Sequence, residues 1–375
     1  MHKKHRKRAH NHIAQFVACC IARLAWVVNL LNHLIEIIQQ HRKTQGQGFH
    51  VSALAGNPPS STQLFLLSKF EFGIAGYLRS EKLTPRLLWQ QVEHRIVPSA
   101  SGYIVFDDSV LDKRYASKIE LARTQYSGNE HGVVQGIGLV SCVYVNVSRS
   151  EFWVIDYRLY DPQRDGKSKL DHVADMLDNL IEYKRVPFAT VLMDAWYATQ
   201  ELMAKIDHIE KIYYCPLKVN RKVDDSQGQQ PYNRVDELEW SEADLAHGKT
   251  IKIRNFPKDK KVKLFRVTVS TSRTDYIVTN DISQNSTDET QKASAVRWRV
   301  EEFHREVKQL TGIEACQCRK ARIQRNHIAC SLLVWSRLKA IASCTDQTIY
   351  QVKAGLLRNY LIGQLKQPDI RMTFV

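Results

Sequence analysis

Four polar side chains in the last third of the sequence have the types and spacing for chemistry on phosphate groups. They follow one another at steps of 3, 4 and 7 residues, so an α-helix would project them from one face; they are Ser294, Arg297, Glu301 and Lys308. A carboxylate can hold a cation, and the two cationic side chains can bind phosphate oxygens. The same spacing also fits a solvated helix with an intrahelical Arg297 to Glu301 ion pair, worth about a few tenths of a kcal/mol.

A separate apolar stripe shows how such a helix would be held in place. The stripe lies well over 90° around the helix from the polar set and consists of Val296, Val300, Phe303, Val307 and Leu310. The helix can therefore pack its apolar face on a core while it presents Arg297, Glu301 and Lys308 elsewhere.

The segment RWRVEEFHREVKQLTG, residues 297–312, resembles the signature of bacterial insertion-sequence transposases of the four-like group. In that signature a Tyr, an Arg, a catalytic Glu and a Lys are separated by two, three and six residues. Arg297, Glu301 and Lys308 occupy the last three positions, and Ser294 replaces the Tyr. The replacement bears on one contact with the terminal phosphate or flanking base, because Ser cannot stack and reaches less far.

The resemblance implies two further catalytic carboxylates, at strand ends upstream. The segments YIVFDDSVLDK and FATVLMDAWYATQ supply them in the right order, as Asp107 and Asp194. Asp107 fits the Asp-x-Ser/Thr pattern of the family through Ser109, and the neighbouring Asp108 is the alternative.

Two Mg²⁺ ions are the cofactor that this resemblance implies, with Mn²⁺ as a substitute. Phosphodiester cleavage needs an activated nucleophile and relief of charge at the reacting phosphate, which two divalent ions about 4 Å apart provide. Carboxylates are the hard oxygen ligands that Mg²⁺ prefers. Asp107, Asp194 and Glu301 are therefore the expected metal ligands, with Asp107 bridging the ions.

The expected DNA contacts come from the signature segment and from one loop. Arg297 and Lys308 would clamp phosphates and position the scissile bond. The remaining members of the predicted set are Trp298, His304 and Arg305, together with Lys167 and Lys169 of the loop DPQRDGKSK, which an ordinary solvated loop would explain as well. Trp240 either packs in a core or stacks on a base, and residues 249–263 supply basic side chains near it.

The elements that must position these residues alternate in type along the chain. Runs rich in Val, Ile and aromatic residues predict strands at 103–106, 133–147, 151–160, 188–193 and 211–217, with an amphipathic helix over 170–184. Three strands that pair as a meander, followed by helix and strand, are typical of an RNase H-like core. Further strands at 250–254, 261–270 and 275–279 indicate an insertion before helices at 287–310 and 327–341.

We therefore expect an α/β fold with an RNase H-like mixed sheet and helices, interrupted by a β-rich insertion and preceded by a helical region. The predicted divisions are 1–95 (helical, DNA-binding), 96–217 (first part of the catalytic core), 218–285 (β-rich insertion), 286–342 (second part of the core) and 343–375 (helical tail).

Composition favours a folded protein with a polyanionic partner. The 375 residues include 54 Lys and Arg against 39 Asp and Glu, a formal charge of +15. The eight cysteines show no CxxC pair or zinc spacing, so we expect reduced thiols in a cytoplasmic protein. The apolar stretch 13–38 is interrupted by polar residues and follows the basic run 3–8, which favours an amphipathic helix over a membrane span.

Function follows from the resemblance, which covers residues 100–340. It implies a bacterial, nucleoid-associated enzyme that cuts double-stranded DNA at terminal inverted repeats, passes through a hairpin, and joins the excised ends to target DNA as a homodimer. No membrane partner is expected. Two alternatives stay open: a catalytically silent DNA-binding derivative of a transposase, and a structure-specific nuclease with an RNase H-like fold.

Overall fold

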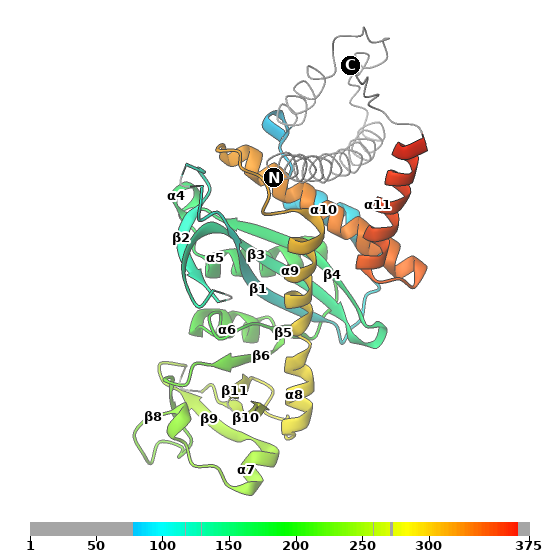
Figure 1. Cartoon of the computed structure of the whole chain (residues 1–375). Coiled ribbons are helices and arrows are strands. Elements are labelled where there is room, and N and C mark those ends of the chain that lie inside the picture. Colours follow the sequence, from blue (N-terminus) through cyan, green and yellow to red (C-terminus); the bar gives the residue numbers. More distant parts are fainter. Residues whose placement is uncertain (1–77, 117, 129, 258, 271–272, 367–375) are drawn as a thin grey trace, which may run out of the picture. The chain divides into compact units, whose positions relative to one another are not determined.

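The computed structural model describes residues 78–366 apart from 117, 129, 258, 271 and 272. The described residues fall into two compact units (Figure 1). The sheet unit contains residues 84–308 and 314–321, and the helical unit contains residues 78–83, 309–313 and 322–366. The predicted helices within residues 1–77, with the basic run 3–8, lie outside the described residues.

Five strands form the core of the sheet unit. β1 (Tyr103–Asp112), β3 (Gly132–Asn146) and β4 (Glu151–Tyr160) form an antiparallel meander. β5 (Thr190–Leu192) pairs parallel with β1, and β6 (Ile212–Leu217) pairs parallel with β5. The resulting order β4-β3-β1-β5-β6 is that of an RNase H-like mixed sheet, which confirms the predicted fold class. The structure adds β2 (Arg123–Ser127), which pairs with β3 and was not predicted.

Helices cover both faces of this sheet. Ile104, Val105 and Phe106 are consecutive in β1 and all 0% exposed, so both faces of the strand are buried. The helices of this part are α3 (Pro85–Val92), η1 (Glu93–Arg95), η2 (Val147–Arg149), α4 (Pro162–Asp165), α5 (Lys169–Asn179) and α6 (Gln200–His208).

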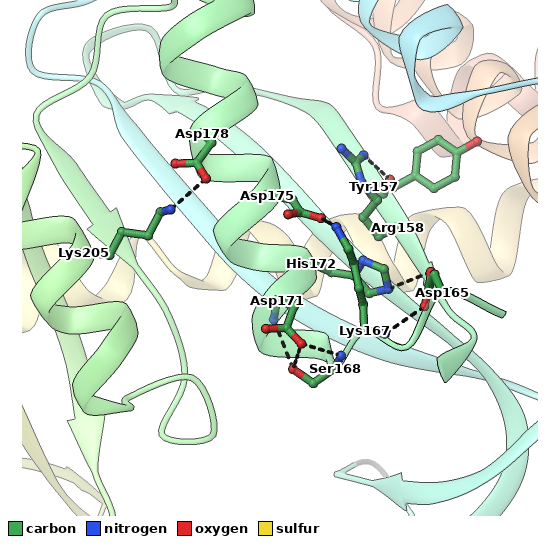
Figure 2. A network of polar contacts seen from close by, with 10 residues as sticks. All are labelled: Tyr157, Arg158, Asp165, Lys167, Ser168, Asp171, His172, Asp175, Asp178 and Lys205. Carbon is green, nitrogen blue, oxygen red and sulfur yellow. Dashed lines mark hydrogen bonds and ion pairs between the residues drawn. The ribbon is translucent and has the colours of Figure 1, made fainter. Parts of the chain in front are cut away.

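The helix predicted at 170–184 is confirmed as α5 continued by a π-helical turn, Leu180–Lys184. Its start is fixed by a capping box in which Ser168 accepts from the Asp171 backbone and Asp171 accepts from the Ser168 backbone (Figure 2). The wider π turn ends at Arg185, which has a left-handed φ of 52°.

The predicted β-rich insertion continues the core sheet. β11 (Arg273–Thr279) pairs with β6, and β10 (Val262–Ser270), β9 (Lys249–Ile253), β7 (Lys222–Asp224) and β8 (Asn233–Arg234) follow in order. The three predicted strands of this segment are confirmed as β9, β10 and β11. The segment also contains η4 (Val235–Glu237) and α7 (Glu242–His247). The division of the chain into five parts stays a prediction.

The helix expected over 287–310 is interrupted, so that part of the prediction is wrong. α8 (Thr287–Ala295) and α9 (Trp298–Thr311) are separated by a turn at Val296 and Arg297. The backbone hydrogen bonds there join residues three apart, from Arg297 N to Ser294 O and from Val300 N to Arg297 O. The chain is therefore wound more tightly there than in an α-helix.

The helical unit is organised by α10 (Ala321–Thr345) and α11 (Ile349–Lys366). The buried Asn326 side chain donates to the carbonyls of Leu78 and Glu81 and accepts from the Leu83 backbone, which ties residues 78–83 to α10. By length and composition α10 could cross a membrane, but 67% of its most apolar window is buried inside the protein, as in an ordinary core helix.

Candidate active site

Strand pairing brings Asp107 next to Asp194. Tyr103 pairs with Thr190 and Val105 with Leu192, a constant offset of 87 residues (190 − 103). The same offset carried two residues further aligns Asp107 with Asp194, which follows the end of β5. The two acids thus lie side by side just beyond the end of the short β5 ladder. Asp107 was expected at the end of its strand, but β1 continues past it to Asp112, because the strand also pairs with β3.

The loop after Asp194 is fixed by the acid itself. Asp194 Oδ1 accepts hydrogen bonds from the backbone N–H groups of Trp196 at 2.9 Å and Tyr197 at 3.2 Å. Oδ2 has no hydrogen bond among the residues that the structure describes. One carboxylate oxygen therefore holds the turn, and the other stays available to a ligand.

Asp107 and Asp108 point to opposite faces of the sheet, because successive side chains in a strand alternate. Asp107 lies 3.5 Å from Arg297 Nη1, in the turn before α9. Asp108 instead accepts from Lys169 Nζ at 2.5 Å, at the start of α5, and from the Tyr197 hydroxyl at 2.7 Å. Asp107 is thus the member of the pair on the face of α9, and Asp108 is already engaged on the other face.

Arg297 connects Asp107 to Glu301. Its Nη2 lies 2.8 Å from Glu301 Oε1, an ion pair across one turn, while its Nη1 reaches Asp107 Oδ2. The predicted intrahelical ion pair is therefore present, although Arg297 lies in the turn and not in α9. Ser294, three residues earlier, is half-buried at the end of α8.

The surroundings of this site disfavour ionisation of two of its acids. Burial, followed by the negative charge of Asp194, raises the pKa of Asp107 from 3.8 to about 8, although Arg297 opposes the change. Burial also raises the pKa of Asp194. Two crowded acids that both resist ionisation indicate a place where an added cation would be stabilised.

The side chains of this site are of the types that bind a divalent ion, but in this structure they lie too far apart to bind one together. Asp107, Asp194 and Glu301 supply oxygen ligands with three potential negative charges against the single charge of Arg297. Among the described residues, however, no three His, Cys, Asp or Glu side chains lie close enough together to hold a metal ion. The Arg297 guanidinium lies between Asp107 and Glu301, where a metal ion held by these acids would lie.

His304 is buried against the sheet, a position that argues against its predicted contact with DNA. Its side chain is only 8% exposed, and its Nε2 lies 3.1 Å from Ser141 Oγ on β3. Burial lowers the pKa of His304 to about 3, so the ring is neutral at physiological pH. The resemblance placed His304 in the signature, but the helical face it occupies is the one packed on the sheet.

The other side chains predicted to contact DNA differ in whether they already have partners within the protein. Trp298 and Arg305 are exposed on α9. Lys308 Nζ instead donates to the Val110 carbonyl at 2.9 Å and lies 3.3 Å from Glu314. Lys169 is engaged with Asp108, and Lys167 Nζ lies 2.5 Å from Asp175 on α5 (Figure 2).

Two side chains after Asp194 were missed by the sequence prediction. The buried Tyr197 bonds to Asp108, and Trp196 is 55% exposed beside the acid. The available signal was the aromatic pair within three residues of a predicted catalytic Asp. In the insertion, Trp240 packs against Tyr276, with ring centroids 6.4 Å apart, and its indole nitrogen is buried, which favours the core-packing alternative.

One of the comparisons with known proteins shows the family of this chain. A search of the curated proteins finds no match. Among solved structures, the chain is similar to a piggyBac transposase, in a cryo-EM structure of its synaptic complex with hairpin DNA, at 13% identity and a TM-score of 0.41, over 84% of this chain and 70% of that one. The family model of the transposase DDE domain matches residues 149–336. That match spans half of the sequence, and the chain belongs to the transposase DDE domain family.

Proposed function

We propose that this protein cuts DNA at the ends of an insertion sequence and joins those ends to target DNA, with Asp107, Asp194 and Glu301 as ligands of two Mg²⁺ ions. The observation that carries the proposal is the alignment of Asp107 with Asp194 across β1 and β5, with Arg297 linking Asp107 to Glu301. Mn²⁺ has the same preference for oxygen ligands and is expected to substitute.

The chain would contribute positioning and charge. When bound, the ions would neutralise the reacting phosphate and activate the attacking oxygen. Asp194 is held by two backbone N–H groups through Oδ1, which leaves Oδ2 to serve as a ligand. Arg297 would leave the carboxylates and bind a phosphate oxygen of the DNA, because its guanidinium suits either anion. Lys308 would exchange its contact with Glu314 for a phosphate.

The proposed reaction is a series of phosphodiester exchanges. A water oxygen attacks the phosphorus at the element boundary, the bond to the 3′ oxygen breaks, and a 3′ hydroxyl remains on the element. That hydroxyl attacks the opposite strand, which closes a hairpin and releases the flanking DNA. A second water opens the hairpin and restores the 3′ hydroxyl. Each 3′ hydroxyl then attacks a phosphorus of the target DNA, and the bond from that phosphorus to the 3′ oxygen of the target strand breaks. We further propose that two copies act on paired ends, in the cytoplasm of a bacterial cell.

Strand cleavage by the purified protein tests this proposal. The substrate is a labelled duplex that carries the DNA flanking the protein's own gene, with Mg²⁺, Mn²⁺ or EDTA. The variants are Asp194→Ala and, as a matched control, Asp178→Ala, which changes a half-buried Asp on α5 paired with Lys205 (Figure 2). We expect metal-dependent cutting at the element boundary, lost in Asp194→Ala and retained in Asp178→Ala.

Two other results would replace the proposal. Firm binding of the ends without cutting in either metal would indicate the silent derivative, for which the replacement of Tyr by Ser294 is a reason. Cutting that follows branched DNA structure and ignores the element boundary would indicate the nuclease alternative.

A further inference from the structure

Tyr197 is a buried polar side chain in the turn that follows Asp194. It is 0% exposed, and a buried hydroxyl needs a hydrogen-bond partner because it has lost its contact with water. The Tyr197 hydroxyl donates to Asp108 Oδ1 at 2.7 Å. The turn after Asp194 is therefore bonded through a side chain to β1, at the residue next to Asp107.

Backbone hydrogen bonds connect each end of this contact to a proposed metal ligand. The Tyr197 N–H donates to Asp194 Oδ1 at 3.2 Å, and the Asp108 N–H donates to Asp107 Oδ1 at 2.8 Å. A chain of bonds thus runs from Asp194 through Tyr197 and Asp108 to Asp107, and the Tyr197 hydroxyl is the member that joins the two segments. In both acids the backbone bond takes Oδ1, so Oδ2 is the oxygen left for a ligand.

The short ladder between β1 and β5 shows why such a bond matters. β5 contains only Thr190–Leu192, and its pairing with β1 covers three residue pairs and ends two residues before Asp107 and Asp194. Beyond that point the ladder no longer fixes the separation of the two acids. The Tyr197 hydroxyl supplies a bond between the turn and β1 where the ladder supplies none.

Lys169 holds the carboxylate that accepts from Tyr197. Lys169 Nζ lies 2.5 Å from Asp108 Oδ2, and the side chains of this pair are 13% and 16% exposed. The ammonium takes Oδ2 while the Tyr197 hydroxyl takes Oδ1, which fixes the rotation of the carboxylate. Because both of its oxygens are occupied, Asp108 is suited to hold Tyr197 and not to bind a metal ion itself.

We propose that Tyr197 is a positioning residue: its hydroxyl bond to Asp108 keeps the turn that carries Asp194 beside β1 and so limits how far Asp194 can move from Asp107. The inference rests on the proposed function, since it takes the two acids to be ligands of the same ions. Without the hydroxyl, metal binding would have to order the turn as well, and the affinity for metal would fall.

Titration of the DNA-free protein with Mn²⁺, followed by calorimetry at pH 7, tests this role. The variants are Tyr197→Phe, which removes the hydroxyl and keeps the ring, Asp108→Ala, and the double variant. The matched control is Tyr144→Phe. Tyr144 lies on β3, is 1% exposed, and its hydroxyl accepts from the Ser99 N–H at 2.8 Å. The control therefore loses a hydroxyl bond of the same kind in the same sheet, outside the bonds that connect the acids.

We expect Tyr197→Phe to bind Mn²⁺ about 10- to 100-fold more weakly than wild type, the usual effect of removing a partner that orients a metal ligand, and Tyr144→Phe to match wild type. The double variant should bind no more weakly than Asp108→Ala, because both changes remove the same bond. Raised Mn²⁺ should restore strand cleavage by Tyr197→Phe toward the wild-type rate, which a general loss of folded structure would not allow.

Amide hydrogen exchange of the metal-free protein gives a second readout. The N–H groups of Trp196 and Tyr197 are bonded to Asp194 Oδ1, so their exchange reports whether the turn is held. Exchange in residues 194–199 should be faster in Tyr197→Phe than in wild type. In Tyr144→Phe these residues should exchange as in wild type.

Equal Mn²⁺ affinity of wild type and Tyr197→Phe would overturn the proposal, as would equal losses in Tyr197→Phe and Tyr144→Phe. Unchanged exchange of residues 194–199 in Tyr197→Phe would overturn it without any metal. If the wild type bound no Mn²⁺, the proposed metal ligands would be wrong, while the exchange experiment would still decide whether Tyr197 holds the turn.

Discussion

Two groups of charged side chains in the sheet unit have opposite balances of acid and cation. Asp156 on β4 is 2% exposed and is paired with two cations, Arg158 and Lys184, the latter at 2.6 Å. Asp107 and Glu301 form ion pairs with one cation, Arg297, and Asp194 forms no ion pair among the described residues. In the first group the negative charge is compensated within the protein, so this group is suited to a structural role. The second has an excess of acid, which an external cation would relieve.

The largest expected difference between the groups is catalytic. Asp194→Asn should reduce strand cleavage by roughly 10³-fold or more, as removal of a catalytic group commonly does. Asp156→Asn should leave cleavage by the folded protein within about fivefold of wild type, because Asp156 lies outside the acid-rich group. Initial cleavage rates, corrected for the folded fraction, check both. Similar losses in the two variants would erase the distinction.

The next effect concerns stability. Asp156→Ala should lower the free energy of unfolding by about 3–5 kcal/mol, because it leaves the Lys184 ammonium, 6% exposed, buried without its carboxylate. Urea titration measures the change. The double variant Asp156→Leu with Lys184→Met should recover much of the loss, since it removes both buried charges. A loss below about 1 kcal/mol in Asp156→Ala would show that this group is not structurally required.

Asp107→Asn should change the pH dependence of stability in the metal-free protein. The folded pKa of Asp107, about 8, lies above its unfolded value of 3.8, so the stability it contributes is present below pH 3.8 and lost as pH rises to about 8. The wild type should therefore lose up to about 1.4 kcal/mol per pH unit in that window relative to Asp107→Asn. Thermal or urea unfolding from pH 5 to 8 measures the difference between the curves. Parallel curves would mean that Asp107 ionises without cost.

The smallest effect is expected at Lys308, a cation already engaged within the protein. Its contacts with the Val110 carbonyl and Glu314 must be exchanged for a DNA phosphate, which limits the gain. Lys308→Ala should weaken binding to element ends by less than about tenfold and reduce the salt slope by about 0.9, one duplex phosphate. An unchanged slope would leave Lys308 as a purely structural contact.

The main elements of the core and the order of the three acids along the chain could be predicted from the sequence. Strand composition and helical spacing predicted the five core strands and α5, and the motif words around Asp107 and Asp194 located acids that strand pairing then brings together. The strands and helices depend on local sequence patterns, and the approach of Asp107 to Asp194 depends on the pairing of only three residues of β1 with β5. The interruption between α8 and α9 was missed, because the apolar stripe continues through Val296 and the turn has no Pro or Gly to mark it.

Contacts between distant segments could not be predicted in the same way. Lys169 was expected at DNA, but its partner Asp108 lies 61 residues away in the chain. His304 was expected at DNA because it belongs to the signature, yet it packs against Ser141 on β3. One cavity is lined by residues 195–201, 217–222 and 254–255, and only the fold brings these three segments together.

Binding of Mn²⁺ to the DNA-free protein tests the central claim most directly, that Asp107, Asp194 and Glu301 form an acid excess that takes divalent ions. Calorimetric titration at pH 7 in buffers of different ionisation enthalpy would compare wild type, Asp107→Asn and Asp156→Asn. We predict that wild type and Asp156→Asn bind Mn²⁺ with release of a proton, because the pKa of Asp107 is raised to about 8. Asp107→Asn should bind at least about tenfold more weakly and release none. Equal affinity and equal proton release in all three proteins would contradict the account.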